Sequence, residues 1–82
     1  MKKLTLATLL ILSYSAALSA DFDKGLAAAK AGDFATALAE WKPLADQGDA
    51  SAQYNLGVMY DLGKGVTEDD EETAKWFRLA AE

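Results

Sequence analysis

Apolar residues recur along most of the chain at the spacing of amphipathic helices. Side chains three or four positions apart share one face of an α-helix, so a stripe with this spacing predicts a helix with one buried side. Four segments follow the pattern: about Phe22–Ala31, Phe34–Gln47, Asp49 to about Leu62, and Asp69 to the end. We therefore predict an all-α chain.

The second segment has the widest apolar stripe. It consists of Phe34, Ala37, Leu38, Trp41, Leu44 and Ala45. Trp41 here and Tyr60 on the third segment lie on inward stripes and are expected in the core, whereas Tyr54 and Trp76 lie at the edges of theirs. Pro43 removes a hydrogen bond to Ala39, so a bend is expected there.

Glycine and aspartate separate the segments. Gly32 and Gly48 can end the first and second helices, and Asp33 and Asp49 can cap the helices that follow by accepting backbone N–H bonds. Connections this short join antiparallel neighbours. The expected arrangement is two stacked α-hairpins.

The chain also contains an internal repeat. Leu38, Trp41 and Ala45 lie 36 residues before Ala74, Phe77 and Ala81, whereas Gly32 lies only 31 residues before Gly63. The two units therefore share their helices but differ by five residues in the connection. A repeat of this length indicates a solenoid, in which each unit stacks on the next.

Residues 48–60, the loop 63–66 and residues 74–82 together resemble a Sel1-like repeat, a relative of the tetratricopeptide repeat. The resemblance implies an α/α solenoid with a tetratricopeptide-like helical hairpin over 21–48 and a Sel1-like repeat over 49–82. It implies close contact between Gly57 and the fourth helix, packing of Tyr60 with Phe77, and positive backbone angles at Gly63 and Gly65. It also places Val66 in the core.

The sequence departs from the family at the start of the fourth helix. Asp70, Glu71 and Thr73 stand where apolar residues or alanines are usual, and Thr67 stands where proline is common. At the other end of that helix, the resemblance leaves the face of Phe77, Ala80 and Ala81 without a following repeat. We expect self-association, or a capping partner, at this end.

The first twenty residues predict a secretory signal peptide. Lys2 and Lys3 precede an apolar run over 4–12, and small residues follow over 13–20. Cleavage after Ala20 and cleavage after Ala17 both fit, and we favour Ala20 because a polar helical segment follows at once. The run is too short for a membrane anchor. The expected location is secreted or periplasmic.

Charge and composition exclude several functions. Without the two leader lysines, six basic and thirteen acidic residues remain, a net charge of −7. Such a chain suits neither nucleic acid nor an anionic membrane surface. The chain has no histidine and no cysteine, which removes common bases, nucleophiles and metal ligands. We predict no catalytic residue, no cofactor and no metal.

One acidic run, Glu68 to Glu72, has two interpretations. Several carboxylates can attract calcium, but the loop spacing of known calcium sites is missing. Acidic residues at a helix N-terminus are also favoured by the helix dipole, with Asp69 as the cap. We favour the second interpretation.

The resemblance implies that the first helix of each hairpin lines a ligand groove. The candidate partner-binding residues are Asp23, Ala27, Lys30, Ser51, Tyr54, Val58 and Asp61. We expect a protein or peptide ligand, and hence an exported, non-catalytic interaction scaffold. Two alternatives stay open: a truncated Sel1 protein without independent function, and a β-lactam-binding or -hydrolysing enzyme. The related enzymes cross-link their repeats through cysteines, which this chain lacks.

Overall fold

Four helices make up the part of the chain that the computed structural model describes, residues 19–82. They are α2 (Phe22–Lys30), α3 (Phe34–Asp46), α4 (Ala50–Leu62) and α5 (Asp70–Ala81). The described residues contain no strand. The signal peptide predicted over 1–20 lies outside them, except for its last two residues.

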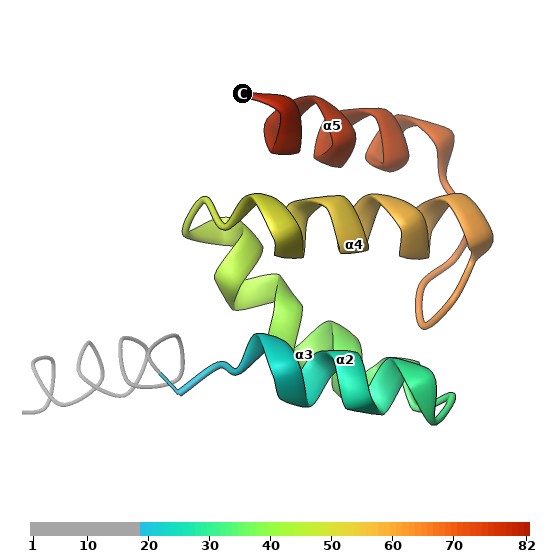
Figure 1. Cartoon of the computed structure of the whole chain (residues 1–82). Coiled ribbons are helices and arrows are strands. Elements are labelled where there is room, and N and C mark those ends of the chain that lie inside the picture. Colours follow the sequence, from blue (N-terminus) through green and yellow to red (C-terminus); the bar gives the residue numbers. More distant parts are fainter. Residues whose placement is uncertain (1–18) are drawn as a thin grey trace, which may run out of the picture.

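Each helix packs against the helix that follows it in the chain. α2 and α3 form one hairpin, α4 and α5 form the other, and the contact between α3 and α4 joins them (Figure 1). The two hairpins are stacked, with α5 at one edge of the stack and α2 at the other. The predictions of an all-α chain and of two stacked hairpins are confirmed.

An aspartate directly precedes each of these helices as its N-cap. The side chains of Asp33, Asp49 and Asp69 accept the backbone N–H of Thr36, of Ala52, and of Glu71 and Glu72 respectively. These caps satisfy N–H groups that have no partner inside the helix. The three predicted caps are therefore confirmed, and Asp21 caps α2 in the same way by accepting from Lys24.

The core is a row of seven apolar side chains on the facing sides of α3, α4 and α5. It consists of Ala37, Trp41, Ala45, Ala52, Leu56, Met59 and Trp76. Trp41 is buried as predicted. Trp76, which the sequence placed at the edge of its stripe, is buried too, whereas Tyr60 is only half-buried against the core. α3 continues through Pro43 to Asp46, and the bend stays a prediction.

Two glycines allow close approach between the helices of each hairpin. A Cβ at Gly57 would lie 2.5 Å from the Phe77 ring, as the family resemblance implied for this position. A Cβ at Gly25 would lie 2.5 Å from Trp41 Nε1. The Gly25 contact could not be predicted from the sequence, because a glycine inside a helix ordinarily indicates only a lower helix propensity.

Gln53 ties the two hairpins together from within the core. Its side chain is 6% exposed, and its Nε2 donates to the Ala45 carbonyl at 3.0 Å. A buried amide needs such a partner, because an unpaired polar group away from water is costly. The bond therefore holds the start of α4 against the end of α3.

The long loop between α4 and α5 folds back onto the first hairpin. Gly63 and Gly65 have φ angles of +66° and +74°, as predicted. Residues other than glycine rarely adopt such positive φ angles. Gly65 lies against Phe34, and Lys64 Nζ stands 5.6 Å from the Phe34 ring centroid. Val66 is half-buried against the core, which confirms its predicted role.

Candidate functional site

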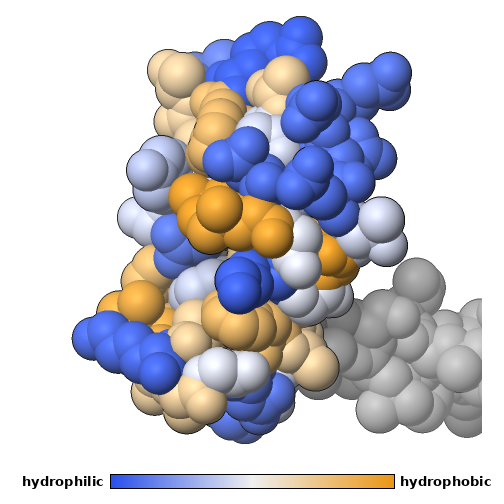
Figure 2. All heavy atoms as spheres, turned by 90° about the vertical axis from the view of Figure 1, so that its right-hand side faces the viewer, coloured by the Kyte–Doolittle hydropathy of each residue, from blue (hydrophilic) through white to orange (hydrophobic). Residues whose placement is uncertain are grey.

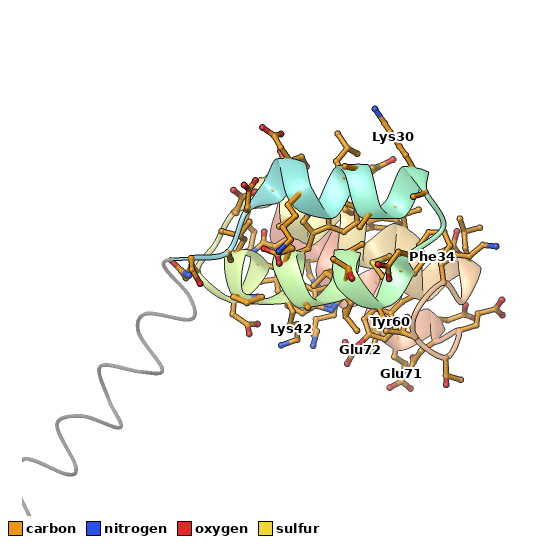
Figure 3. All side chains as sticks on the ribbon, turned by 90° about the horizontal axis from the view of Figure 1, so that it is seen from below. Lys30, Phe34, Lys42, Tyr60, Glu71 and Glu72 are labelled. Carbon is orange, nitrogen blue, oxygen red and sulfur yellow. The ribbon has the colours of Figure 1, made fainter. Side chains whose placement is uncertain are left out.

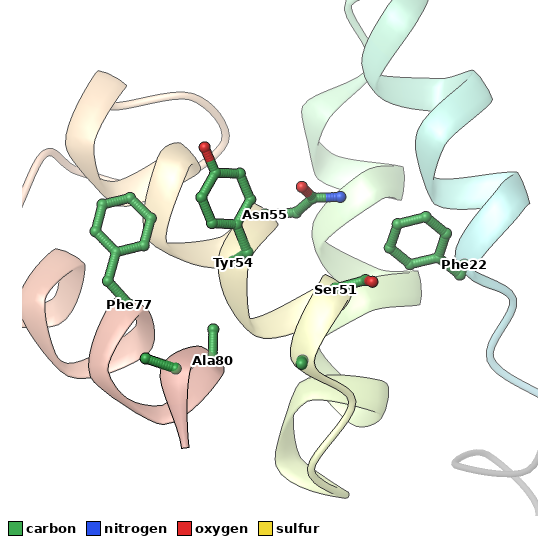
Figure 4. Close-up of a pocket in the computed structure, with 8 residues that line it drawn as sticks. Phe22, Ser51, Tyr54, Asn55, Phe77 and Ala80 are labelled. Carbon is green, nitrogen blue, oxygen red and sulfur yellow. The ribbon is translucent and has the colours of Figure 1, made fainter.

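A hollow on the described surface crosses the first half of α4. We call it the main groove, and it has a volume of about 560 Å³. Its lining residues are Phe22, Ala50, Ser51, Tyr54, Asn55, Phe77, Ala80 and Ala81. α4 thus forms its floor, with the start of α2 on one side and the end of α5 on the other (Figure 4).

Aromatic rings supply most of the chemistry of the main groove. Tyr54 is 56% exposed, and its ring lies 5.4 Å from that of Phe77, centroid to centroid. On the other side, Phe22 packs against Trp41 at 5.7 Å. The rings are therefore held by neighbours while one surface stays open to solvent. Such surfaces bind apolar side chains, and the Ser51 and Asn55 side chains add hydrogen-bonding groups.

A second, smaller hollow continues along α4 toward its C-terminal end. Its volume is about 200 Å³, and Leu26, Ala29, Phe34, Trp41, Asn55, Val58, Met59, Leu62 and Lys64 line it. Asn55 belongs to both hollows, so they adjoin. On the loop side of the molecule, apolar atoms gather at mid-height between hydrophilic residues (Figure 2).

The structure divides the seven predicted groove residues into two sets. Ser51 and Tyr54 line the main groove, and Val58 lines the second hollow. The other four, Asp23, Ala27, Lys30 and Asp61, are exposed and line neither. Figure 3 shows Lys30 pointing away from the other helices. A binding role for these residues stays a prediction.

The sequence missed the contribution of α5 to the groove. The family resemblance placed the groove on the first helix of each hairpin, yet Phe77 and Ala80 come from the second helix of the second hairpin. The expectation that Phe77 lies on the open outer side is wrong, because its half-buried ring packs on Gly57 and Tyr54 of α4. The large apolar residue that α5 does expose is Leu79, 37% accessible.

The acidic run at the start of α5 is occupied by structural contacts. Asp69 Oδ1 accepts from two backbone N–H groups, while Glu72 accepts from Trp76 Nε1 and pairs with Lys75 at 2.9 Å. Among residues 19–82, no three His, Cys, Asp or Glu side chains are grouped so that they could hold a metal ion. Within the run, Asp69 therefore acts as a helix cap and Glu72 forms a local ion pair.

The hydrogen bonds to Asp33 also shift its titration. The Thr36 hydroxyl donates to its carboxylate at 2.6 Å, and the Thr36 backbone N–H donates at 3.1 Å. These bonds favour the ionised carboxylate and hold the pKa of Asp33 below its ordinary value of 3.8. The shift belongs to helix capping and not to a catalytic group, since Asp33 lines neither hollow.

Comparison with known protein families identifies the second hairpin. Residues 50–82 match the family model for the Sel1 repeat. These residues form a Sel1 repeat. The match covers α4, the long loop and α5, and Sel1 repeats typically act as non-catalytic modules for protein interaction. No curated protein and no solved structure matches the chain.

The helices of the Sel1 repeat and of the hairpin before it are short. In the described part of the chain, none of them is long and apolar enough to cross a membrane.

Proposed function

We propose that this protein is an exported, non-catalytic adaptor that binds a polypeptide segment in the main groove. The observation that carries the proposal is the exposed Tyr54 ring, packed at a tilt against Phe77 within a groove of about 560 Å³ that lies largely on the Sel1 repeat. Because Phe77 already holds this exposed ring in place, a ligand that packs on it has less side-chain freedom to immobilise. Aromatic anchors of this kind commonly contribute much of the binding energy at protein interfaces.

The charge around the main groove favours a basic partner. Phe22, Ala50 and Ala81 line it, and their chain neighbours Asp21, Asp23, Asp49 and Glu82 are all exposed carboxylates. Arg78, beside Phe77, is the exposed cation nearest in the chain to a lining residue. Because residues 21–82 carry a net charge of −7, long-range attraction also favours a cationic ligand. The occupant we propose is a polypeptide segment with apolar and basic side chains.

The proposed location rests on the first twenty residues. Their basic start, apolar run and small residues support export through a signal peptide. An exported chain of this size often depends on disulfides. This chain has no cysteine. Burial of its two tryptophans and the contacts of its long loop stabilise the fold in place of disulfides.

Selection from a random peptide library on the immobilised protein tests the binding function. We expect enrichment of peptides that combine aromatic or aliphatic residues with lysine or arginine. Tyr54→Lys and Ala80→Lys each put an ammonium group into the main groove, where it repels a basic peptide, and should weaken binding of the enriched peptides at least about tenfold.

The matched control is Ala27→Lys, which adds the same charge on an exposed position of α2 that lines neither hollow. Its affinity should stay within about twofold of the wild type, and circular dichroism should show all three variants helical. The absence of any enriched peptide would refute the binding function. Equal losses in all three variants would refute the site.

A further inference from the structure

Two neighbouring side chains of α3 hold the first two residues of the first hairpin. Glu40 Oε1 accepts the backbone N–H of Asp21, with 3.0 Å between nitrogen and oxygen. Next to it, Trp41 Nε1 donates to the Phe22 carbonyl at 3.1 Å. The Glu40 side chain is only 15% exposed and the Trp41 residue 3%. The backbone at the start of α2 is therefore held against α3 by one exposed and one part-buried hydrogen bond.

Asp21 is also the residue that the favoured signal-peptide cleavage would leave first in the chain. In that cleavage a signal peptidase uses one water molecule to break the bond between the Ala20 carbonyl carbon and the Asp21 nitrogen. Ala20 leaves as a carboxylate, and the Asp21 nitrogen takes up the protons to become an α-ammonium group. This group is mostly charged at neutral pH, since an α-amino group ordinarily has a pKa of about 8.

We propose that the Glu40 carboxylate is the binding site for the α-ammonium group that cleavage creates at Asp21. The proposal rests on the export proposed above and on cleavage after Ala20. In the uncleaved chain, Glu40 accepts one neutral N–H from this nitrogen. In the processed chain the same pair of atoms forms an ion pair, and charge-assisted hydrogen bonds are roughly twice as strong as neutral ones.

The charges around this nitrogen fit an added cation. An ammonium group at the start of a helix lies at the positive end of the helix dipole, which is unfavourable without a compensating anion. Glu40 provides one through Oε1, while its Oε2 lies 3.5 Å from Lys24 Nζ. The Asp21 carboxylate accepts from the Lys24 backbone N–H, and Asp23 adds another anion in the first turn. The start of α2 thus has three carboxylates, those of Glu40, Asp21 and Asp23, and one lysine, so the local charge favours an added cation.

The position of the cut decides whether the ion pair forms. Cleavage after Ala17, the alternative that the sequence leaves open, would put the ammonium group on Leu18. The Asp21 nitrogen would then stay a neutral amide. Processing after Ala20 therefore stabilises the folded hairpin, and processing after Ala17 does not stabilise it through Glu40.

The first part of the test is the intact mass of the protein after expression of the full chain in an exporting bacterium. The expected mass is that of Asp21–Glu82. A mass that corresponds to Leu18–Glu82, or to the unprocessed chain, overturns the proposal. The intact mass does not report on peptide binding in the main groove, so the binding function is tested separately by the peptide selection.

The second part measures urea unfolding of the processed protein and of Glu40→Gln, which keeps an oxygen acceptor but removes the charge. We expect the folding equilibrium constant to fall about tenfold. Wild type and Glu40→Gln are then compared again in a protein with a threonine inserted between Ala20 and Asp21. The insertion moves the ammonium group one residue away from Glu40. In the insertion protein, Glu40→Gln should lower the folding equilibrium constant no more than about threefold, since a neutral hydrogen bond remains. Equal losses in both backgrounds overturn the proposal.

A third measurement needs no substitution at Glu40 and covers the case in which that variant does not fold. An acylating reagent labels the α-amino group, and peptide mapping follows the rate. An ammonium group paired with Glu40 should react at least about threefold more slowly in the processed wild type than in the threonine-insertion protein. Equal rates contradict the ion pair.

Discussion

At the scale of single residues, the hairpins depend on places where a side chain is missing. A Cβ at Gly25 would lie within 3 Å of three atoms of the Trp41 ring, and Trp41 is buried and hydrogen-bonded to Phe22. A Cβ at Gly57 would meet the Phe77 ring, which is half-buried. The two positions therefore differ in how easily the neighbouring ring can move.

Gly25→Ala tests the closer of these contacts. Helix propensity alone would make alanine more stable by about 1 kcal/mol. Overpacking a core costs about 1–3 kcal/mol, so we expect Gly25→Ala to lower the free energy of unfolding by up to about 2 kcal/mol. Urea denaturation measures the change.

Gly57→Ala is the comparison variant, and its loss should be smaller because the Phe77 ring can swing toward the open groove. A stabilising effect of Gly25→Ala would show that Trp41 is not held where the structure places it.

The pKa of Asp33 predicts a pH dependence of stability. The Thr36 hydroxyl and backbone N–H hold this pKa below 3.8 in the folded state. A lowered carboxylate pKa adds stability above the unfolded value, and that stability is lost as the pH falls through the folded value. Asp33→Asn keeps a capping oxygen but does not titrate.

The difference in unfolding free energy between wild type and Asp33→Asn should therefore shrink as the pH falls from about 5 to about 2.5. Thermal melts across this range measure it. A difference that stays constant would mean that the bonds to Thr36 do not depend on the charge of Asp33.

At the scale of elements, the caps and the loop could be predicted to different extents. Asp33, Asp49 and Asp69 were recognisable as caps because the capping bond is local in sequence. The contact of Gly65 with Phe34 joins two hairpins. No local pattern reveals such a contact, because it depends on how the hairpins stack.

Gly65→Ala should destabilise the joint between the hairpins. The residue has a φ of +74°, and an added Cβ would lie 2.9 Å from the Phe34 Cβ. Strain at a positive φ and overpacking both oppose alanine, so we expect a loss of about 1–3 kcal/mol. Hydrogen exchange should show the loop and the start of α3 opening more often. Unchanged exchange at Phe34 would contradict the docking of the loop.

At the scale of the whole molecule, the stack of hairpins determines the groove. The sequence identified Ser51 and Tyr54 through the family resemblance, since groove positions on the first helix of a repeat follow from its register. It missed Phe77 and Ala80 because their accessibility depends on how α5 lies against α4. Asp23, Ala27 and Lys30 followed from aligning the first unit with the second, but the two units differ in their connection, and α2 presents Phe22 to the groove instead.

We propose that the main groove, which lies largely on the Sel1 repeat over residues 50–82, binds an apolar, basic polypeptide segment. The most direct test of this claim is an NMR titration of the protein with the consensus peptide from the library selection, following backbone amide shifts. The account predicts the largest changes at Ser51, Tyr54, Asn55 and Ala80, with little change at Lys30 and Asp61. The largest changes at Asp23, Ala27 and Lys30, or no changes on α4 and α5, would contradict it.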